Sequence, residues 1–199
     1  MYKVTEIFQS IQGEGLHTGQ PCNFIRLAGC PNHCNFCDTD FSETERLSAA
    51  AILKQLDPLL THVVITGGEP MAQGLAPLTT ILHNHGFFIQ LETSGWYSDI
   101  GSALDTYRSC NFVSLSPKAT THYYHDYFYG EVKWLVPPTT LDDIVWKLAP
   151  YHWLQPVNDG LKINRQHLEQ ALGMLMHANV PSGCTLRLSP QVHKLIGVR

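Results

Sequence analysis

Short apolar runs bounded by turn residues recur along the chain, and such runs are typical of strands buried in a sheet. Seven of them predict strands, at residues 22–29, 62–66, 87–92, 111–116, 132–136, 152–155 and 185–189. Helical patterns lie between them, at about 49–60, 75–84, 98–107, 140–148 and 165–178; the last has Leu168, Ala171, Leu172, Leu175 and Met176 on one face. This alternation predicts an α/β fold with a mainly parallel sheet, open or partly closed like a barrel.

Length and composition indicate a folded protein of modest size. The 199 residues contain no internal repeat or Gly/Ser linker, so we expect a single domain over residues 1–199. Hydrophobic residues make up 44%, which excludes a disordered chain, and no apolar run approaches the roughly 18 residues of a membrane span. The first residues, MYKVTEIFQS, show no signal-peptide pattern, so we expect a cytoplasmic protein. A net charge of −4 without a basic run argues against direct nucleic-acid binding.

Polar and glycine-rich turns follow five of the predicted strands. GCPNHCNFC follows the first strand, TGGEP the second, ETSG the third, SPK the fourth and QPVND the sixth. Because the carboxyl ends of parallel strands meet at one edge of a sheet, these turns are expected to line one pocket.

Three of the six cysteines lie in the first of these turns. Cys30, Cys34 and Cys37 form C-x3-C-x2-C, whereas Cys22, Cys110 and Cys184 are scattered. That layout does not fit a disulfide framework and favours a metal or cluster site. A structural zinc uses four ligands, while three thiolates on a 4Fe-4S cluster leave one iron open. A zinc site that recruits His33 or Cys22 as fourth ligand remains the alternative.

The cysteine turn resembles the motif of the radical S-adenosylmethionine (SAM) enzymes, CxxxCxΦC, with an aromatic residue, here Phe36, before the last cysteine. The resemblance implies a partial (β/α) barrel and a 4Fe-4S cluster held by Cys30, Cys34 and Cys37. It also implies that SAM chelates the open iron and that the reduced cluster cleaves SAM to a 5′-deoxyadenosyl radical, which abstracts hydrogen from the substrate. The cofactor then carries the chemistry and the protein positions it, so no catalytic side chain is expected.

The same resemblance assigns a SAM site. TGGEP looks like the family's GGE motif, in which Gly67, Gly68 and Glu69 would hold the SAM amino group; glycine lets a backbone carbonyl approach an ammonium closely. Alone, Gly-Gly after a strand is more often only a turn. The resemblance further implies that SAM contacts Phe36, Asp38, Gly95, Ser116, Pro117, Lys118, Gln155, Pro156, Val157 and Asn158.

Further motifs narrow the resemblance to one family. IQGEG, F-x-R-L-x-G-C, C-D-T, TGGEP, ETSG, SPK, QP and HK-x-x-G follow in an order similar to that of the 7-carboxy-7-deazaguanine synthases, nearly end to end. That family implies conversion of 6-carboxy-5,6,7,8-tetrahydropterin to 7-carboxy-7-deazaguanine, with loss of ammonia, on the route to queuosine. It also implies that SAM is regenerated in each turnover and that Mg²⁺ assists the reaction. The family resemblance further implies a flavodoxin- or ferredoxin-type reductant and a homodimer.

The resemblance assigns Thr39 to Mg²⁺, although one hydroxyl is a poor magnesium signature. Its implied substrate contacts are Ile11, Gln12, Gly13, Arg26, Thr93 and Arg199. Arg26 also stands out from the residues themselves, because it is a lone cation in an apolar strand. Its partner is either a substrate carboxylate or an internal Glu6 or Glu14.

Two other functions compete with this interpretation. A short activase that makes a glycyl radical on a partner enzyme would carry the same cysteine spacing, although IQGEG, Arg26 and the HK motif argue against it. A non-enzymatic zinc or iron–sulfur module would leave TGGEP and the strand-end pattern unexplained. The aromatic stretch 120–130 matches no motif, and packing at a dimer surface explains it better than a cover over the pocket.

Overall fold

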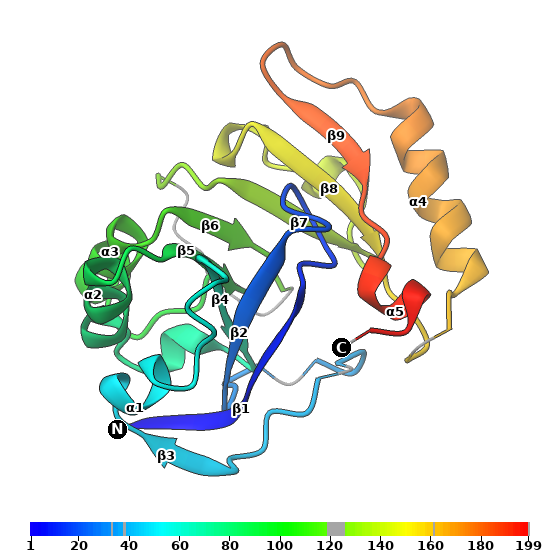
Figure 1. The fold of residues 1–199 in the computed structure, drawn as a ribbon. Helices are drawn as coiled ribbons and strands as arrows, with labels where there is room; N and C mark the ends of the chain where they lie inside the picture. The colour runs from blue at the N-terminus through cyan, green and yellow to red at the C-terminus, as the bar shows by residue number, and fades with distance from the viewer. Residues whose placement is uncertain (33, 38, 119–125, 161, 199) are drawn as a thin grey trace.

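The computed structural model describes residues 1–32, 34–37, 39–118, 126–160 and 162–198, and these residues form one nine-stranded sheet (Figure 1). The strand order is β3-β1-β2-β4-β5-β6-β7-β8-β9, and every neighbouring pair from β2 to β9 is parallel. The strands are β1 Tyr2–Ile11, β2 Pro21–Leu27, β3 Glu45–Leu47, β4 His62–Gly67, β5 Phe88–Thr93, β6 Phe112–Leu115, β7 Glu131–Val136, β8 Tyr151–Pro156 and β9 Thr185–Leu188. The predicted parallel α/β sheet is confirmed, and β3 and β9 form its edges, so the barrel is open.

Two strands were not expected from the sequence. β1 and β3 run antiparallel to their neighbours, with β1 between β2 and β3. β1 carries the polar residues Thr5, Glu6, Gln9 and Ser10 among its apolar ones, which hides the strand pattern. It nevertheless pairs with β2 over most of its length and extends the sheet.

Five helices are described, and all but the last lie on the outer side of the sheet; the last contributes His193 and Lys194 to the wall of a cavity on the inner face. The helices are α1 Ala49–Leu53, α2 Ala76–Asn84, α3 Ile100–Ser109, α4 Arg165–His177 and α5 Val192–Ile196, with 3-10 turns η1 Pro70–Ala72, η2 Leu141–Asp143 and η3 Trp146–Leu148. In Figure 1, α2 and α3 lie side by side, and α4 lies along β8 and β9. No helix within the described ranges is long and apolar enough to cross a bilayer.

Two helix predictions were wrong in extent. The segment 140–148 forms the turns η2 and η3 in place of one helix, because Thr140 and Asp143 cap each other and Ile144 is extended. α1 ends at Leu53, well short of residue 60, and Pro58 disfavours helical backbone just before it. On α4, Ala171 is buried, but Leu172 is 37% and Met176 75% exposed, because α4 covers the sheet close to its β9 edge.

The two faces of the sheet differ in polarity. On β7, Val132, Trp134 and Val136 pack in the apolar core with the helices, whereas Glu131 and Lys133 point to the opposite, inner face. The inner faces of other strands repeat this pattern, with Arg26 on β2, Gln90 and Glu92 on β5 and Gln155 on β8. The inner face therefore offers a polar surface for a site.

Candidate functional site

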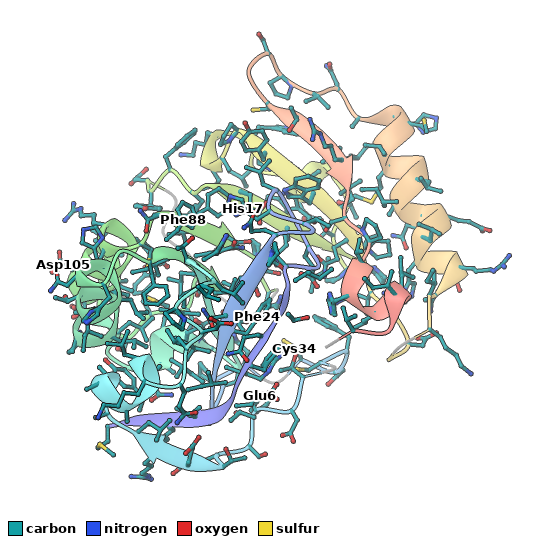
Figure 2. All side chains as sticks on the ribbon, viewed as in Figure 1. Glu6, His17, Phe24, Cys34, Phe88 and Asp105 are labelled. Carbon is teal, nitrogen blue, oxygen red and sulfur yellow. The ribbon has the colours of Figure 1, made fainter. Side chains whose placement is uncertain are left out.

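A cavity of about 560 Å³ lies on the inner face at the carboxyl ends of the strands. Its wall includes Arg26 near the end of β2, Thr66 near the end of β4, Thr93 at the end of β5, Ser116 after β6 and Gln155 near the end of β8. Figure 2 places Cys34, Phe24 and Glu6 on this inner side and Asp105 on the outer surface of α3. The strand-end turns thus line one pocket, as the sequence predicts.

Most residues expected at the site are on the cavity wall. Those on the wall are Ile11, Gln12, Arg26, Cys30, Cys34, Phe36, Cys37, Thr39, Gly67, Gly68, Thr93, Ser116, Lys118, Gln155, Pro156, Val157 and Asn158. The wall does not include Gly13, Glu69, Gly95 or Pro117. Asp38, Arg199 and the alternative zinc ligand His33 lie outside the described residues.

The cysteine loop follows β2 directly. Cys37 N–H donates to Cys34 O at 3.1 Å, which closes a turn between two of the thiols. Burial raises the pKa of the Cys30 thiol, a hydrogen bond with the Asn32 backbone opposes that rise, and the nearby Glu69, Cys34 and Cys37 add to it. Within the described ranges, no three His, Cys, Asp or Glu side chains are already arranged around a common metal position.

Cys22 is placed away from this loop. It lies near the start of β2 in an apolar cluster with Phe8, Phe24 and Val64, and is fully buried. Burial raises the pKa of its thiol to about 12. Leu27, the last residue of β2, is about 17 Å further along the strand. The geometry therefore does not support Cys22 as a fourth metal ligand beside Cys30.

The Gly67-Gly68 turn packs directly against the start of the cysteine loop. A Cβ on Gly67, whose φ is +148°, would lie 2.1 Å from Leu27 O, and one on Gly68 would lie 2.3 Å from Gly29 O and 2.8 Å from Cys30 Cβ. Gly68 N–H donates to Leu27 O at 3.1 Å. Glycine is required here because two backbones meet, a reason that differs from the expected approach to an ammonium.

Glu69 points into the protein, away from the cavity wall. It is fully buried and accepts hydrogen bonds from Thr93 Oγ1 at 2.7 Å, from Ser94 N–H at 2.8 Å and from Met71 N–H at 3.0 Å. Burial raises the pKa of this carboxyl, and these bonds oppose the rise. Glu69 thus joins the turn after β4 to the end of β5 and fixes both at the rim of the cavity.

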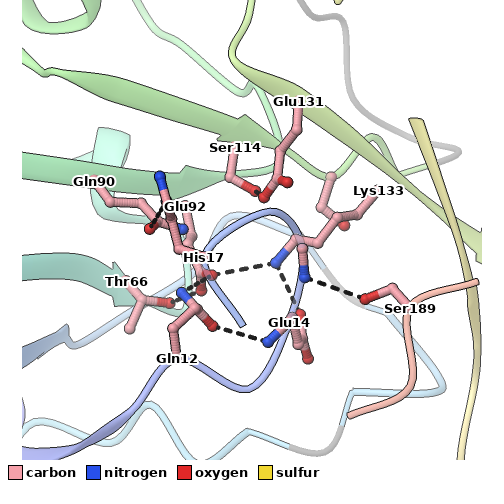
Figure 3. A network of polar contacts seen from close by, with 12 residues as sticks. Gln12, Glu14, His17, Thr66, Gln90, Glu92, Ser114, Glu131, Lys133 and Ser189 are labelled. Carbon is pink, nitrogen blue, oxygen red and sulfur yellow. Dashed lines mark hydrogen bonds and ion pairs between the residues drawn. The ribbon is translucent and has the colours of Figure 1, made fainter. Parts of the chain in front are cut away.

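A buried cluster of charges forms the floor of the cavity (Figure 3). Lys133 Nζ lies 2.8 Å from Glu14 Oε2 and 3.2 Å from Glu92 Oε1. Burial alone would lower the pKa of Lys133, but these carboxylates and Glu131 outweigh it and raise the pKa. Lys133 in turn holds the pKa of Glu14 below its usual range. The Lys133–Glu14 pair is therefore charged at neutral pH.

Sequence reasoning missed this floor. The sequence signal for the floor is the alternation of polar and apolar residues in two strands. In FIQLET it places Gln90 and Glu92 on one face of β5, and in EVKWLV it places Glu131 and Lys133 on one face of β7. A parallel sheet covered by apolar layers on both faces reads as a continuous apolar run. The alternation therefore indicates a polar inner face.

Arg26 forms an internal ion pair with Glu6, which is one of the partners expected from the sequence. Its Nε donates to Glu6 Oε1 at 2.7 Å, and the two side chains are 22% and 21% exposed. The guanidinium also lies 5.7 Å from the centre of the Phe8 ring. All three residues line the cavity, so the pair remains within reach of a ligand.

In the described part of the aromatic stretch, residues 126–130, Tyr127 and Tyr129 pack against α3, whereas Phe128 is 66% exposed. The ring centres of Tyr127 and Tyr129 lie 4.9 Å and 5.7 Å from that of Tyr107 on α3, and Tyr129 is fully buried. Neither tyrosine lines the cavity.

The family model of the radical SAM superfamily matches residues 24–149. Over 210 residues the chain is 31% identical to the 7-carboxy-7-deazaguanine synthase of Haemophilus influenzae, covering 99% of this chain and 94% of the relative. The chain belongs to the 7-carboxy-7-deazaguanine synthase family of the radical SAM superfamily. It is also 31% identical over 205 residues to the family member from Synechocystis, covering 100% of this chain and 94% of that one. The crystal structure of QueE from Escherichia coli has a TM-score of 0.67 and 27% identity, covering 96% and 94% of the two chains.

Radical SAM enzymes use a 4Fe-4S cluster and SAM, and the cavity residues fit both groups. Cys30, Cys34 and Cys37 supply three thiol donors from one loop, the ligand type that iron–sulfur clusters require. Gln155 Oε1 is a buried acceptor on the wall without a hydrogen-bond partner among the described residues. A buried acceptor is costly to leave unpaired, so a ligand that brings an N–H or O–H group is expected beside it.

Proposed function

We propose that this protein converts 6-carboxy-5,6,7,8-tetrahydropterin to 7-carboxy-7-deazaguanine in queuosine biosynthesis, by ring contraction with loss of ammonia. One observation carries the proposal: a single cavity brings together the three-cysteine loop, the Gly67-Gly68 turn and a buried ionic floor. A non-enzymatic metal module would have no use for that floor.

Cys30, Cys34 and Cys37 would hold the cluster, and the groups that hold SAM would come from the surrounding wall. When bound, the cluster and SAM supply the electron and the radical that start the reaction. The Gly67-Gly68 turn would offer backbone groups, and Glu69 would fix that turn through Thr93 and Ser94. The remaining wall residues proposed for SAM are Phe36, Ser116, Lys118, Gln155, Pro156, Val157 and Asn158.

The substrate would lie between Arg26 and the ionic floor. Arg26 would bind the substrate carboxylate, since a guanidinium matches a carboxylate in shape and charge. Gln12 donates from Nε2 to Glu92 Oε1 at 3.1 Å, and this bond orients its amide, which can both donate to and accept from a pterin edge. Ile11 and Thr93 complete the proposed contacts, and Thr39 would contribute its hydroxyl to Mg²⁺.

The function is tested by anaerobic reconstitution with iron and sulfide, followed by incubation with SAM, dithionite and the carboxytetrahydropterin. We expect 7-carboxy-7-deazaguanine by mass spectrometry from the wild type and none from Cys34→Ala. A reconstituted protein that cleaves SAM but leaves the pterin unchanged would contradict the proposal and favour the activase. A protein that binds zinc in place of a cluster would favour the metal module.

We further propose a flavodoxin- or ferredoxin-type reductant and a homodimer, both from the family resemblance. Sedimentation velocity would test the dimer, and replacement of dithionite by reduced flavodoxin or ferredoxin would test the reductant.

A further inference from the structure

The loop of residues 12–20, which joins β1 to β2, enters the inner side of the sheet and folds back on itself. Gln12 N–H donates to Gln20 O at 2.8 Å, and Gly19 N–H donates to Gln12 O at 2.7 Å. Gln12 and Glu14 line the cavity, whereas Gly15, Leu16 and His17 do not. The loop therefore presents one side to the site and the other to the interior of the protein.

Glu131, the first residue of β7, contacts this interior side of the loop (Figure 3). Its Oε2 accepts from Leu16 N–H at 2.7 Å, and its Oε1 accepts from Ser114 Oγ at 2.7 Å. A Cβ on Gly15, whose φ is +68°, would lie 2.2 Å from Glu131 Oε1. Glu131 is fully buried and is not part of the cavity wall. The carboxylate and the loop backbone are thus in direct contact, away from the proposed substrate.

Glu131 is the acidic residue among the side chains that bond to the tip of the loop in the described part of the chain. Gly15 N–H donates to Ser189 Oγ at 3.3 Å, and His17 Nδ1 lies 2.9 Å from Gln90 Oε1. A hydrogen bond to a carboxylate is roughly twice as strong as a neutral one. Leu16 is only two residues from Glu14, whose carboxylate must lie within 2.8 Å of Lys133 to complete the floor of the cavity.

We propose that Glu131 is a positioning residue for substrate binding: through the Leu16 N–H it holds the 12–20 loop so that Gln12 and Glu14 stay on the floor of the cavity. The inference rests on the proposed function, because the substrate is the pterin. It assigns Glu131 no contact with substrate, SAM or cluster.

The first test measures the loop without using activity. Glu131→Met keeps a side chain of similar length but removes both acceptors. By hydrogen exchange and mass spectrometry, amides of residues 12–20 should exchange about 10- to 100-fold faster in this variant, the factor expected for loss of a hydrogen bond to a charged group. Ser114→Ala is the matched control, because it removes the other bond of Glu131 and leaves Leu16 bonded. Unchanged loop exchange in Glu131→Met would overturn the inference.

The second test separates positioning from a general loss of stability. In the reconstituted enzyme, Glu131→Met should raise the KM for the pterin about tenfold or more, while SAM cleavage without substrate stays near the wild-type rate. Glu131→Gln should restore the KM, because its amide oxygen can accept from Leu16 N–H while its NH₂ donates to Ser114 Oγ. Val132→Ala, on the opposite face of β7, should lower stability without changing the KM.

The outcomes distinguish this inference from the proposed function. If the wild type makes no deazapurine, the proposed function fails, and the exchange test still decides the role of Glu131 in the loop. If the wild type is active and Val132→Ala raises the KM as much as Glu131→Met does, Glu131 is merely structural. Should Glu131→Met not fold, Gly15→Ala perturbs the same contact from the loop side and must raise loop exchange and KM together.

Discussion

Replacing Lys133 by Met tests whether the floor of the cavity is held together by charge. Lys133 is the cation between Glu14 and Glu92, and its side chain is only 5% exposed, compared with 14% and 20% for the two carboxylates. Methionine fills much of the same volume but carries no charge. The variant therefore leaves two largely buried carboxylates without their cation.

The expected loss of stability is large. Removal of one partner of a buried ion pair typically costs about 3–5 kcal/mol, because the remaining charge stays buried without compensation. With a denaturant dependence of about 2 kcal/mol per molar urea, the unfolding midpoint should fall by about 2 M. Urea unfolding followed by circular dichroism measures this shift, and Lys147→Met, at an exposed position on η3, is the matched control and should change the midpoint little.

The pH dependence gives a second, independent check. In the wild type the pKa of Glu14 is lowered, so its contribution to stability is present above its unfolded pKa of about 4.3 and is lost as pH falls through the lowered value. In Lys133→Met burial dominates and raises that pKa, so stability is greatest below about 4.3 and is lost as pH rises through the raised value. The difference between the two proteins should therefore shrink from pH 7 to pH 5. A deficit below about 1 kcal/mol that does not change with pH would refute the reasoning.

Three further replacements test the site. Cys34→Ala should abolish the cluster absorbance near 400 nm and SAM cleavage, whereas Cys22→Ala should retain both; equal loss in the two variants would contradict the three-thiolate site. Gly68→Ala should lower the free energy of unfolding by about 1–3 kcal/mol and reduce iron incorporation, because its Cβ would meet Gly29 O and Cys30 Cβ, while Gly74→Ala, with open space around it, should not. Arg26→Ala should lower kcat/KM for the pterin by roughly thirtyfold or more yet still release 5′-deoxyadenosine slowly without substrate, with partial rescue by Lys; a near-normal kcat/KM would assign Arg26 to the Glu6 pair alone.

The parallel part of the sheet could be predicted because its signals are local. Runs such as HVVIT and FFIQLE are strongly apolar and end in glycine or polar turns, so the strands and the edge at which those turns meet follow from the sequence. β1 and β3 could not be predicted in this way. β1 mixes polar and apolar residues because one of its faces lines the cavity through Glu6 and Phe8, and β3 has only three residues.

The candidate site was predicted where it follows a motif and missed where it depends on strand faces. The cysteine loop and the Gly67-Gly68 turn carry their signal in consecutive residues. Lys133, by contrast, contacts Glu14 only once the sheet has formed. β7 must pair in register with β8, and the 12–20 loop must place Glu14 beside a residue that lies 119 positions away in the sequence. No local pattern encodes such a contact.

The polar inner face also explains why the 12–20 loop enters the protein. Lys133 and Glu92 are fixed on neighbouring parts of the sheet, and burying them as a single pair leaves hydrogen-bonding capacity unfilled on both. Glu14 supplies the second carboxylate, and Gln12 donates to Glu92 Oε1. The same residues that stabilise this buried charge form the floor on which a substrate would rest. A change at Glu14 is therefore expected to lower stability and substrate affinity together, whereas Glu131, which is not on the cavity wall, is expected to act on affinity through the loop.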